Sequence, residues 1–225
     1  MIPVLTIRPQ PGASRTVKAG ADLGLDITAF PLSEVHALEW QAPEPHDVDA
    51  LLVASANVFA HGGPQLELYR DKPAYAVGPV TARAAQRAGF TVQLAGSEGL
   101  QHLLDQITHR PARLLRLAGQ RHLPIDPSTD VTIITAEVYG LRDLPMPAAM
   151  ADLLRQGSLV LLHSAGAAEH FRGECERLWL DLSRIRLAAF GPRIAEAAGA
   201  GWGEVRWADQ PANGALLDLA AQMCQ

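Results

Sequence analysis

Residues 74–94, AYAVGPVTARAAQRAGFTVQL, decide the fold, because residues 187–207, LAAFGPRIAEAAGAGWGEVRW, repeat their pattern. In each stretch a short apolar run ends in Gly-Pro, an Ala-rich segment follows, and a Gly-aromatic pair precedes a second apolar run. Glycine permits a sharp exit from a strand, and proline suits the first turn of a helix. We therefore predict strand, tight turn, helix and strand in both stretches, with Gly78 and Gly191 at the turns. The repetition indicates a duplicated α/β unit.

The composition is that of a globular chain with enough apolar residues to bury a core. Its 225 residues, 48% hydrophobic and 19% charged, fit two domains of ordinary size. The net charge of −5 argues against a nucleic-acid-binding surface. The sequence has no apolar run of about 18 residues and no basic, apolar N-terminal signal, so we expect a cytoplasmic protein without membrane contact. Cys175 and Cys224 are too isolated for a zinc ribbon or a disulfide framework and are expected to pack in helices.

The order of the predicted elements indicates one domain inserted into another. The segment from residue 158 onward repeats the order that begins at residue 49, but it lacks two final strands, which the first 30 residues provide. We expect a discontinuous domain of residues 1–34 and 142–225, an inserted domain of residues 36–137, and crossovers near 31–37 and 137–141 that form a two-stranded linker. Because strands alternate with helices, each domain is predicted to be a flavodoxin-like parallel sheet with helices on both faces.

Local signals predict how some elements begin and where large side chains lie. Ser55 and Ser97 are expected to begin helices, the first of which runs to about Tyr69, because a serine hydroxyl can accept from an unpaired backbone N–H. The tryptophans are expected to fill core or helix–sheet contacts; they are Trp179, Trp202 and Trp207.

The turns after the predicted strands carry the candidate binding groups. Ligands of open parallel sheets lie beyond the carboxyl ends of the strands, where helix N-termini offer N–H groups and a positive dipole end. The candidate substrate-binding residues are Arg8, Ser55, Ala56, Asn57, Gly78, Thr81, Ser97, Gly119, Ser164, Ala165, Gly191, Arg193 and Asn213. Two such edges facing each other would suit a small molecule with several carboxylates or phosphates. The alternative is that each turn serves only the fold.

Other motifs for chemistry do not fit. The glycines of GPVTARAAQRAG have the wrong spacing for a dinucleotide fingerprint, and the sequence has no P-loop. Ser164 lacks the Gly-x-Ser-x-Gly context of a nucleophilic serine. His163 and His170 are interpreted as surface or capping histidines and not as a metal pair, so no metal or other cofactor is expected.

Four motifs together resemble the uroporphyrinogen-III synthase family. They are SAN at 55–57, VGPVTA at 77–82, AEVY at 136–139 and QPANGALL at 210–217, and their order extends the resemblance over essentially the whole chain. The resemblance implies two α/β domains on a two-stranded linker and a monomeric, cofactor-free cytoplasmic lyase of haem and other tetrapyrrole biosynthesis. Such an enzyme converts hydroxymethylbilane to uroporphyrinogen III, with loss of water and inversion of the last (D) pyrrole ring. The implied partners are this linear tetrapyrrole and, transiently, the enzyme that forms it.

The resemblance also implies roles for single residues. Tyr139 matches the family tyrosine at the crossover, which implies a hydrogen bond to the departing hydroxyl and general-acid assistance; a packing role in the linker is the alternative. Ala212 stands where the family commonly has threonine, so a hydroxyl contact is lost there. Two other functions stay open: a two-domain cytosolic binder or sensor of an anionic metabolite, and a transferase acting on phosphosugars.

Overall fold

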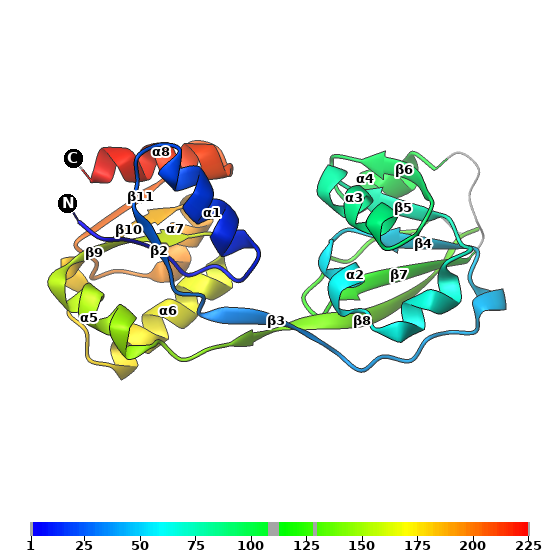
Figure 1. Ribbon diagram of the computed structural model, residues 1–225, viewed down its shortest axis with the longest axis horizontal. Helices are drawn as coiled ribbons and strands as arrows, with labels where there is room; N and C mark the ends of the chain where they lie inside the picture. The colour runs from blue at the N-terminus through cyan, green and yellow to red at the C-terminus, as the bar shows by residue number, and fades with distance from the viewer. Residues whose placement is uncertain (1, 108–112, 128–129, 225) are drawn as a thin grey trace. The chain divides into compact units, whose positions relative to one another are not determined.

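The computed structural model describes residues 2–107, 113–127 and 130–224. It is a mixed α/β structure whose two sheets consist mainly of parallel strands, which confirms the predicted fold class at this level (Figure 1). The chain divides into two compact units: unit 1 is Met1–Glu34 with Arg142–Gln225, and unit 2 is Val35–Leu141. Among the described residues, no helix is long and apolar enough to span a membrane.

Five parallel strands form the sheet of unit 1, in the order β11-β10-β9-β1-β2. The strands are β1 (Val4–Thr6), β2 (Ile27–Ala29), β9 (Ser158–Leu162), β10 (Ile185–Ala189) and β11 (Glu204–Trp207). The central strand β9, SLVLL, is buried along its whole length, as expected for a parallel strand covered on both faces. Its pairing with β1 places Val4 opposite Leu159, so the two ends of the sequence share one sheet.

Helices cover both faces of this sheet (Figure 1). On one face α1 (Gly12–Ala21) and α8 (Asn213–Met223) lie over a core that includes Leu161 and Leu217. On the other face α5 (Ala148–Gln156), α6 (Ala165–Arg177) and α7 (Pro192–Ala198) bury a core that includes Phe171 and Trp202, and the 3₁₀ turn η3 (Leu182–Arg184) precedes β10. Cys175 lies in the second core, which confirms its predicted packing role, and burial raises the pKa of its thiol to about 12.

Six strands form the second sheet, in the order β3-β8-β7-β4-β5-β6. They are β3 (Ser33–Ala37), β4 (Ala50–Val53), β5 (Ala74–Val77), β6 (Val92–Gly96), β7 (Arg113–Gly119) and β8 (Thr132–Asp143). The pairs β4–β5, β4–β7, β5–β6 and β7–β8 are parallel. The long strand β8 continues without a break through the predicted crossover at 137–141, and beside it Leu38 donates its N–H to the Val138 carbonyl at 3.0 Å.

Short helices cover the faces of the second sheet. The 3₁₀ turn η1 (Pro45–Asp47) precedes β4. One core lies under α2 (Asn57–His61), the 3₁₀ helix η2 (Pro64–Tyr69) and α3 (Pro79–Arg87). The opposite core lies under α4 (Leu100–Asp105) and includes Leu103 and Leu104.

The two repeated stretches form the predicted elements: β5-α3-β6 in unit 2 and β10-α7-β11 in unit 1. The turn glycines differ in conformation. Gly78 has φ +81°, which favours glycine, whereas Gly191 has φ −178° and ψ 171°, an extended conformation open to any residue. The prediction that both turns exploit glycine's conformational freedom is therefore wrong for Gly191.

Other local predictions are also corrected. The helix expected to run from Ser55 to Tyr69 is broken at Gly62-Gly63-Pro64, because Gly63 adopts φ +73° and a 3₁₀ helix follows. The Ser55 hydroxyl does accept from the Asn57 N–H at 3.2 Å, but Ala56 is the residue that precedes α2. The helix expected to begin at Ser97 begins at Leu100, after Gly99 with φ +104°.

The tryptophan prediction holds for one residue of three. Trp202 is buried and stacks on Phe171 with ring centroids 5.5 Å apart. Trp179 is 94% exposed and Trp207 is 51% exposed, so neither is a core residue. Trp179 follows the last turn of α6 and Trp207 ends an edge strand, and at both places the chain runs along the surface.

Candidate active site

The candidate residues of unit 1 gather at one edge of its sheet. Because the five strands are parallel, the segments that follow them lie at the same, carboxyl edge. Arg8 follows β1, Ser164 and Ala165 open α6 after β9, Gly191 and Arg193 open α7 after β10, and Asn213 opens α8 after β11. The structure thus brings these six predicted residues to one edge of unit 1.

A chain of hydrogen bonds joins side chains of α1, α8 and two strand ends at this edge. Arg8 donates through Nη1 to Thr16 Oγ1 at 3.3 Å, and Thr16 Oγ1 donates to Asn213 Oδ1 at 3.1 Å. His163 Nε2 lies 3.4 Å from the same Asn213 oxygen, and its ring packs on Phe190 with centroids 4.6 Å apart. The bond between Thr16 and Asn213 joins residues that are 197 positions apart in the sequence.

Of the two basic side chains in this chain of bonds, Arg8 carries the charge and His163 does not. Burial, and then the charge of Arg15, lowers the pKa of Arg8, whose guanidinium fills the space that a Cβ on Gly12 would need. Burial, and then the charge of Arg8, lowers the pKa of His163 from 6.5 to about 4, although the Asn213 side chain and the Leu161 backbone oppose this. His163 is therefore neutral near pH 7.

The candidate residues of unit 2 lie at the carboxyl edge of the other parallel set. Ser55, Ala56 and Asn57 follow β4, Gly78 and Thr81 follow β5, Ser97 follows β6, Gly119 ends β7 and Tyr139 lies in β8. The side chain of Thr81 is buried, whereas that of Ser97 is exposed. Of the predicted positions, those in unit 2 contribute mostly backbone groups and small side chains.

A β-bulge sets the direction of the Tyr139 side chain. In the pairing of β7 with β8, Ala118 lies opposite Glu137 and Gly119 opposite Tyr139, so Val138 is an extra residue. Such bulges re-aim a side chain. The phenol ring lies directly over Gly119, because a Cβ added to that glycine would be 2.6 Å from Tyr139 Cζ and 2.9 Å from its hydroxyl oxygen. The side chain of Tyr139 lies half-buried at the edge of the sheet.

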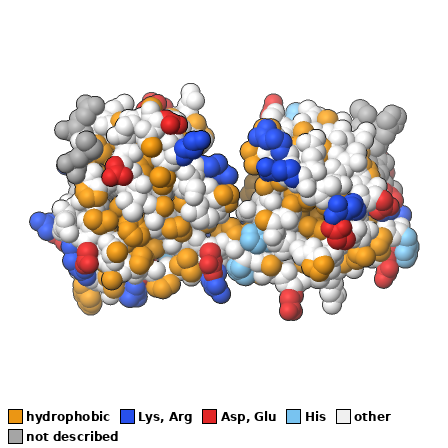
Figure 2. Space-filling model, in the orientation of Figure 1, with side chains coloured by type: hydrophobic (Ala, Val, Ile, Leu, Met, Phe, Trp, Pro, Cys, Tyr) orange, Lys and Arg blue, Asp and Glu red, His pale blue; other side chains and the backbone are white. Residues whose placement is uncertain are grey.

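Lys and Arg side chains occur near both edges although the chain is acidic overall. Figure 2 shows such side chains over α1 in unit 1 and over α3 in unit 2. The exposed residues concerned are Arg15 and Lys18 on α1, and Arg83 and Arg87 on α3. Both helices begin at the carboxyl edges, so Arg15 and Arg83 add positive potential nearer the candidate site than Lys18 and Arg87, which lie in the last turns.

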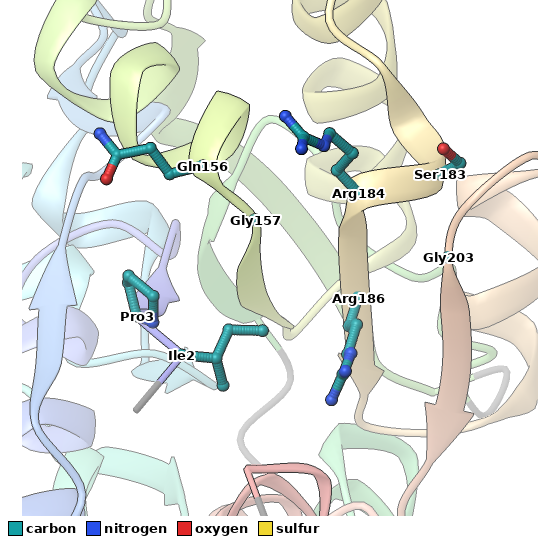
Figure 3. Close-up of a pocket in the computed structure, with 8 residues that line it drawn as sticks. All are labelled: Ile2, Pro3, Gln156, Gly157, Ser183, Arg184, Arg186 and Gly203. Carbon is teal, nitrogen blue, oxygen red and sulfur yellow. The ribbon is translucent and has the colours of Figure 1, made fainter.

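A cavity of 650 Å³ lies at the opposite edge of unit 1 (Figure 3). Its lining consists of Ile2, Pro3, Gln156, Gly157, Ser183, Arg184, Arg186 and Gly203. These residues precede or begin the strands, so the cavity lies at the amino edge, where ligands of parallel sheets do not usually bind. Its two arginines already donate to backbone carbonyls, Arg184 to Arg155 and Arg186 to Met223, both at 2.9 Å. None of the predicted site residues lines it.

A protein-family model described as uroporphyrinogen-III synthase HemD matches residues 14–218. The chain belongs to this family. Two solved structures agree with the fold. A uroporphyrinogen-III synthetase from Helicobacter pylori 26695 is 17% identical with a TM-score of 0.66, and the match covers 99% of this chain and 100% of that one. A mutant uroporphyrinogen III synthase from the extremely thermophilic bacterium Thermus thermophilus is 16% identical with a TM-score of 0.51, covering 100% and 99%. No curated protein sequence matches.

Membership of the HemD family assigns the chain to the cyclising lyases of tetrapyrrole biosynthesis, as the four motifs predicted. The matched region contains every candidate site residue except Arg8.

Sequence reasoning missed Thr16 and His163 as members of the site. The only signal for His163 was its place between a buried strand and the Ser164 turn, and nothing local marked Thr16.

Proposed function

We propose that the chain cyclises hydroxymethylbilane to uroporphyrinogen III, releasing water and inverting the D ring. Membership of the HemD family carries this proposal. The chemistry of the two carboxyl edges supports it, because every ring of the substrate bears two carboxylates and both edges carry helix N-termini and nearby arginines.

The substrate supplies most of the driving force for the reaction. The electron pair of a pyrrole nitrogen expels the terminal hydroxide and leaves an azafulvenium cation. The substituted carbon of the last ring attacks this cation and gives a spiro intermediate, which fragments and closes again at the free carbon of that ring with loss of a proton. That proton balances the one gained by the departing hydroxide, so water is the only by-product. The protein must fold the chain of rings and exclude the simpler closure to the type I isomer.

We assign binding of the substrate carboxylates to the predicted residues at the two edges. In unit 1 these are Arg8, Ser164, Ala165, Gly191, Arg193 and Asn213. In unit 2 they are Ser55, Ala56, Asn57, Gly78, Ser97 and Gly119, with Thr81 acting only through its backbone because its side chain is buried. Arg8 suits this role best, because it is a half-buried guanidinium without an ion pair to any carboxylate among the described residues.

We assign to Tyr139 the hydrogen bond to the departing hydroxyl. The bulge in β8 and the glycine under its ring hold the phenol in one orientation at the edge of the sheet. A positioned phenol can act as a general acid, and such groups typically contribute about 10² to 10⁴ to the rate. Since the pyrrole nitrogen already drives hydroxide loss, we place the contribution of Tyr139 at the lower end of this range.

The strand orders support two flavodoxin-like domains. Numbered along unit 1, the order β2-β1-β9-β10-β11 is 2-1-3-4-5, the flavodoxin order. In unit 2 the order is β8-β7-β4-β5-β6. If β7 is numbered 1, β8 is numbered 2 and β4 to β6 are numbered 3 to 5, this order is also 2-1-3-4-5. The proposal therefore includes a discontinuous domain, 1–34 with 142–225, an inserted domain, 36–137, and a linker of β3 and β8. It also includes action as a cytoplasmic monomer that receives its unstable substrate from the enzyme that forms it.

Separation of the product isomers tests the proposed function. Hydroxymethylbilane is generated enzymatically in the presence of the protein, and the products are oxidised and separated. The proposal predicts the type III isomer in excess. The type I isomer alone, which is the product of uncatalysed closure, would refute it.

A further inference from the structure

The side chain of Asn213 is held from two sides by groups that the proposed function does not use. Its Oδ1 accepts from Thr16 Oγ1 at 3.1 Å and faces His163 Nε2 at 3.4 Å. Thr16 is itself oriented, because its hydroxyl accepts from Arg8 at 3.3 Å and can then donate onward. With the carbonyl oxygen of Asn213 turned toward these donors, its amide NH₂ points away from them.

The tautomer of His163 follows from this arrangement. Because the Asn213 oxygen can only accept, we assign the hydrogen of the neutral imidazole to Nε2 and the lone pair to Nδ1. Nδ1 is buried and has no hydrogen-bond partner among the described residues. The Phe190 ring packs against the imidazole and limits its rotation. His163 is therefore a neutral donor to Asn213 whose ring is restrained by Phe190.

The groups that face His163 disfavour a positive charge on its imidazole. They are the Arg8 guanidinium, the Asn213 amide, the Leu161 carbonyl and the Phe190 ring. None of these is an acid, and Arg15 adds to the positive charge near Arg8. A neutral imidazole can therefore contribute geometry without competing with Arg8 for an anion.

We propose that His163 is a positioning residue which, with Thr16, fixes the Asn213 amide beside Arg8, so that both donate to one carboxylate of the substrate. This inference rests on the proposed function for the identity of the anion, but the fixing of Asn213 is a property of the folded chain alone. His163 acts through Asn213 and touches no reacting atom, so its loss weakens substrate binding more than it slows turnover.

The test is a double-mutant cycle of His163→Phe and Asn213→Ala, with KM and kcat measured separately on hydroxymethylbilane. The phenylalanine keeps the ring contact with Phe190 but removes the donor. We expect His163→Phe to raise KM about 3- to 10-fold, which corresponds to releasing one immobilised side chain, with kcat changed less than about 2-fold. In the Asn213→Ala background the same substitution should leave KM unchanged, because residues that act through one group are not additive. Independent, multiplying effects on KM would overturn the proposal.

His163→Gln and His170→Gln complete the set. Glutamine at 163 retains a donor and should restore part of the affinity. His170 pairs with the Leu144 backbone carbonyl at 2.8 Å, away from this chain of bonds, and its substitution should leave KM unchanged. If His163→Phe does not fold, the cycle is run with His163→Gln and a smaller expected effect on KM, about 2- to 3-fold.

A readout without substrate separates this proposal from the proposed function. In spectra of ¹⁵N-labelled protein the Asn213 side-chain NH₂ pair should shift in His163→Phe and in Thr16→Val, and should not shift in His170→Gln. If the wild-type protein makes no type III isomer, the proposed function is refuted. The spectrum still tests whether His163 and Thr16 position the Asn213 side chain. If neither His163→Phe nor Thr16→Val shifts the Asn213 side-chain NH₂ signals, the positioning role is overturned.

Discussion

The partly buried, neutral His163 predicts a specific loss of stability in mild acid. The pKa of this imidazole is about 4 in the folded chain, against an ordinary value of 6.5, so the unfolded chain binds its proton first as the pH falls. The stability that His163 contributes is complete above pH 6.5, is lost between 6.5 and 4, and does not change further below 4. At about 1.4 kcal/mol per pKa unit, the full loss is at most about 3 kcal/mol. About 2 kcal/mol of it should disappear between pH 7 and pH 5.

Urea unfolding at pH 7 and at pH 5 measures this loss. Tryptophan fluorescence reports on unit 1 through Trp202, which is buried against Phe171. The matched variant is His163→Gln, which removes the titrating group and keeps a polar side chain. The difference between the two pH values should be about 2 kcal/mol larger for the wild type than for this variant. Equal differences for both proteins would refute the account of His163 as a partly buried neutral group near Arg8.

Three further outcomes follow from the same structure. Tyr139→Phe should lower kcat by about 10²-fold or less in a folded protein, and complete loss of turnover would contradict the assigned role. Gly119→Ala places a Cβ 2.6 Å from the Tyr139 ring and should lower kcat similarly. The control is Gly173→Ala, where a Cβ on α6 would meet open space, and kcat should not change. Urea unfolding should show that this control is more stable than the wild type by roughly 0.5–1 kcal/mol. Trp179 lies two residues after the end of α6 with φ +53° and 94% exposure, so Trp179→Gly should raise the unfolding free energy by about 1 kcal/mol; a decrease would show that the indole ring makes a stabilising contact.

The elements of the parallel sheets could be predicted because their signals are local. Each apolar run that ends in Gly-Pro became a strand followed by a helix, at Ala74–Arg87 and at Ile185–Ala198. Buried strands such as Ser158–Leu162 are apolar on both faces, which a sequence displays directly. The order of these elements was enough to predict the α/β class, and four short motifs were enough to predict the family.

The errors arose where a turn competes with a helix signal. The sequence predicted a helix from Ser55 to Tyr69. The pair Gly62-Gly63 interrupts it, because Gly63 has a positive φ. A separate 3₁₀ helix then begins at Pro64. Trp179 occupies the position after α6 where glycine is usual: its N–H and that of Leu180 bond back to Glu176 and Cys175. A tryptophan in that place is exposed, although its residue type alone suggests the core.

The geometry of the site could not be predicted because it depends on long-range pairing. Thr16 and Asn213 meet only because β1 inserts beside β9, which brings α1 and α8 onto one face. The direction of Tyr139 depends on the extra residue Val138 in the pairing with β7, and no residue type in AEVYGL marks a bulge. The candidate positions were found from strand ends, but their hydrogen bonds and burial required the structure.

Mapping of the bound product by NMR tests most directly the claim that the carboxyl edges of the two parallel sheets bind the tetrapyrrole. Backbone amide shifts are recorded on ¹⁵N-labelled protein during titration with uroporphyrinogen III under reducing conditions. The account predicts that the largest changes fall on residues 55–57, 78, 80 and 81 in one unit and on 164, 165, 191, 193 and 213 in the other, with Arg184 and Arg186 at the amino edge unaffected. Changes centred on the amino-edge cavity, with the strand-end turns unmoved, would contradict it.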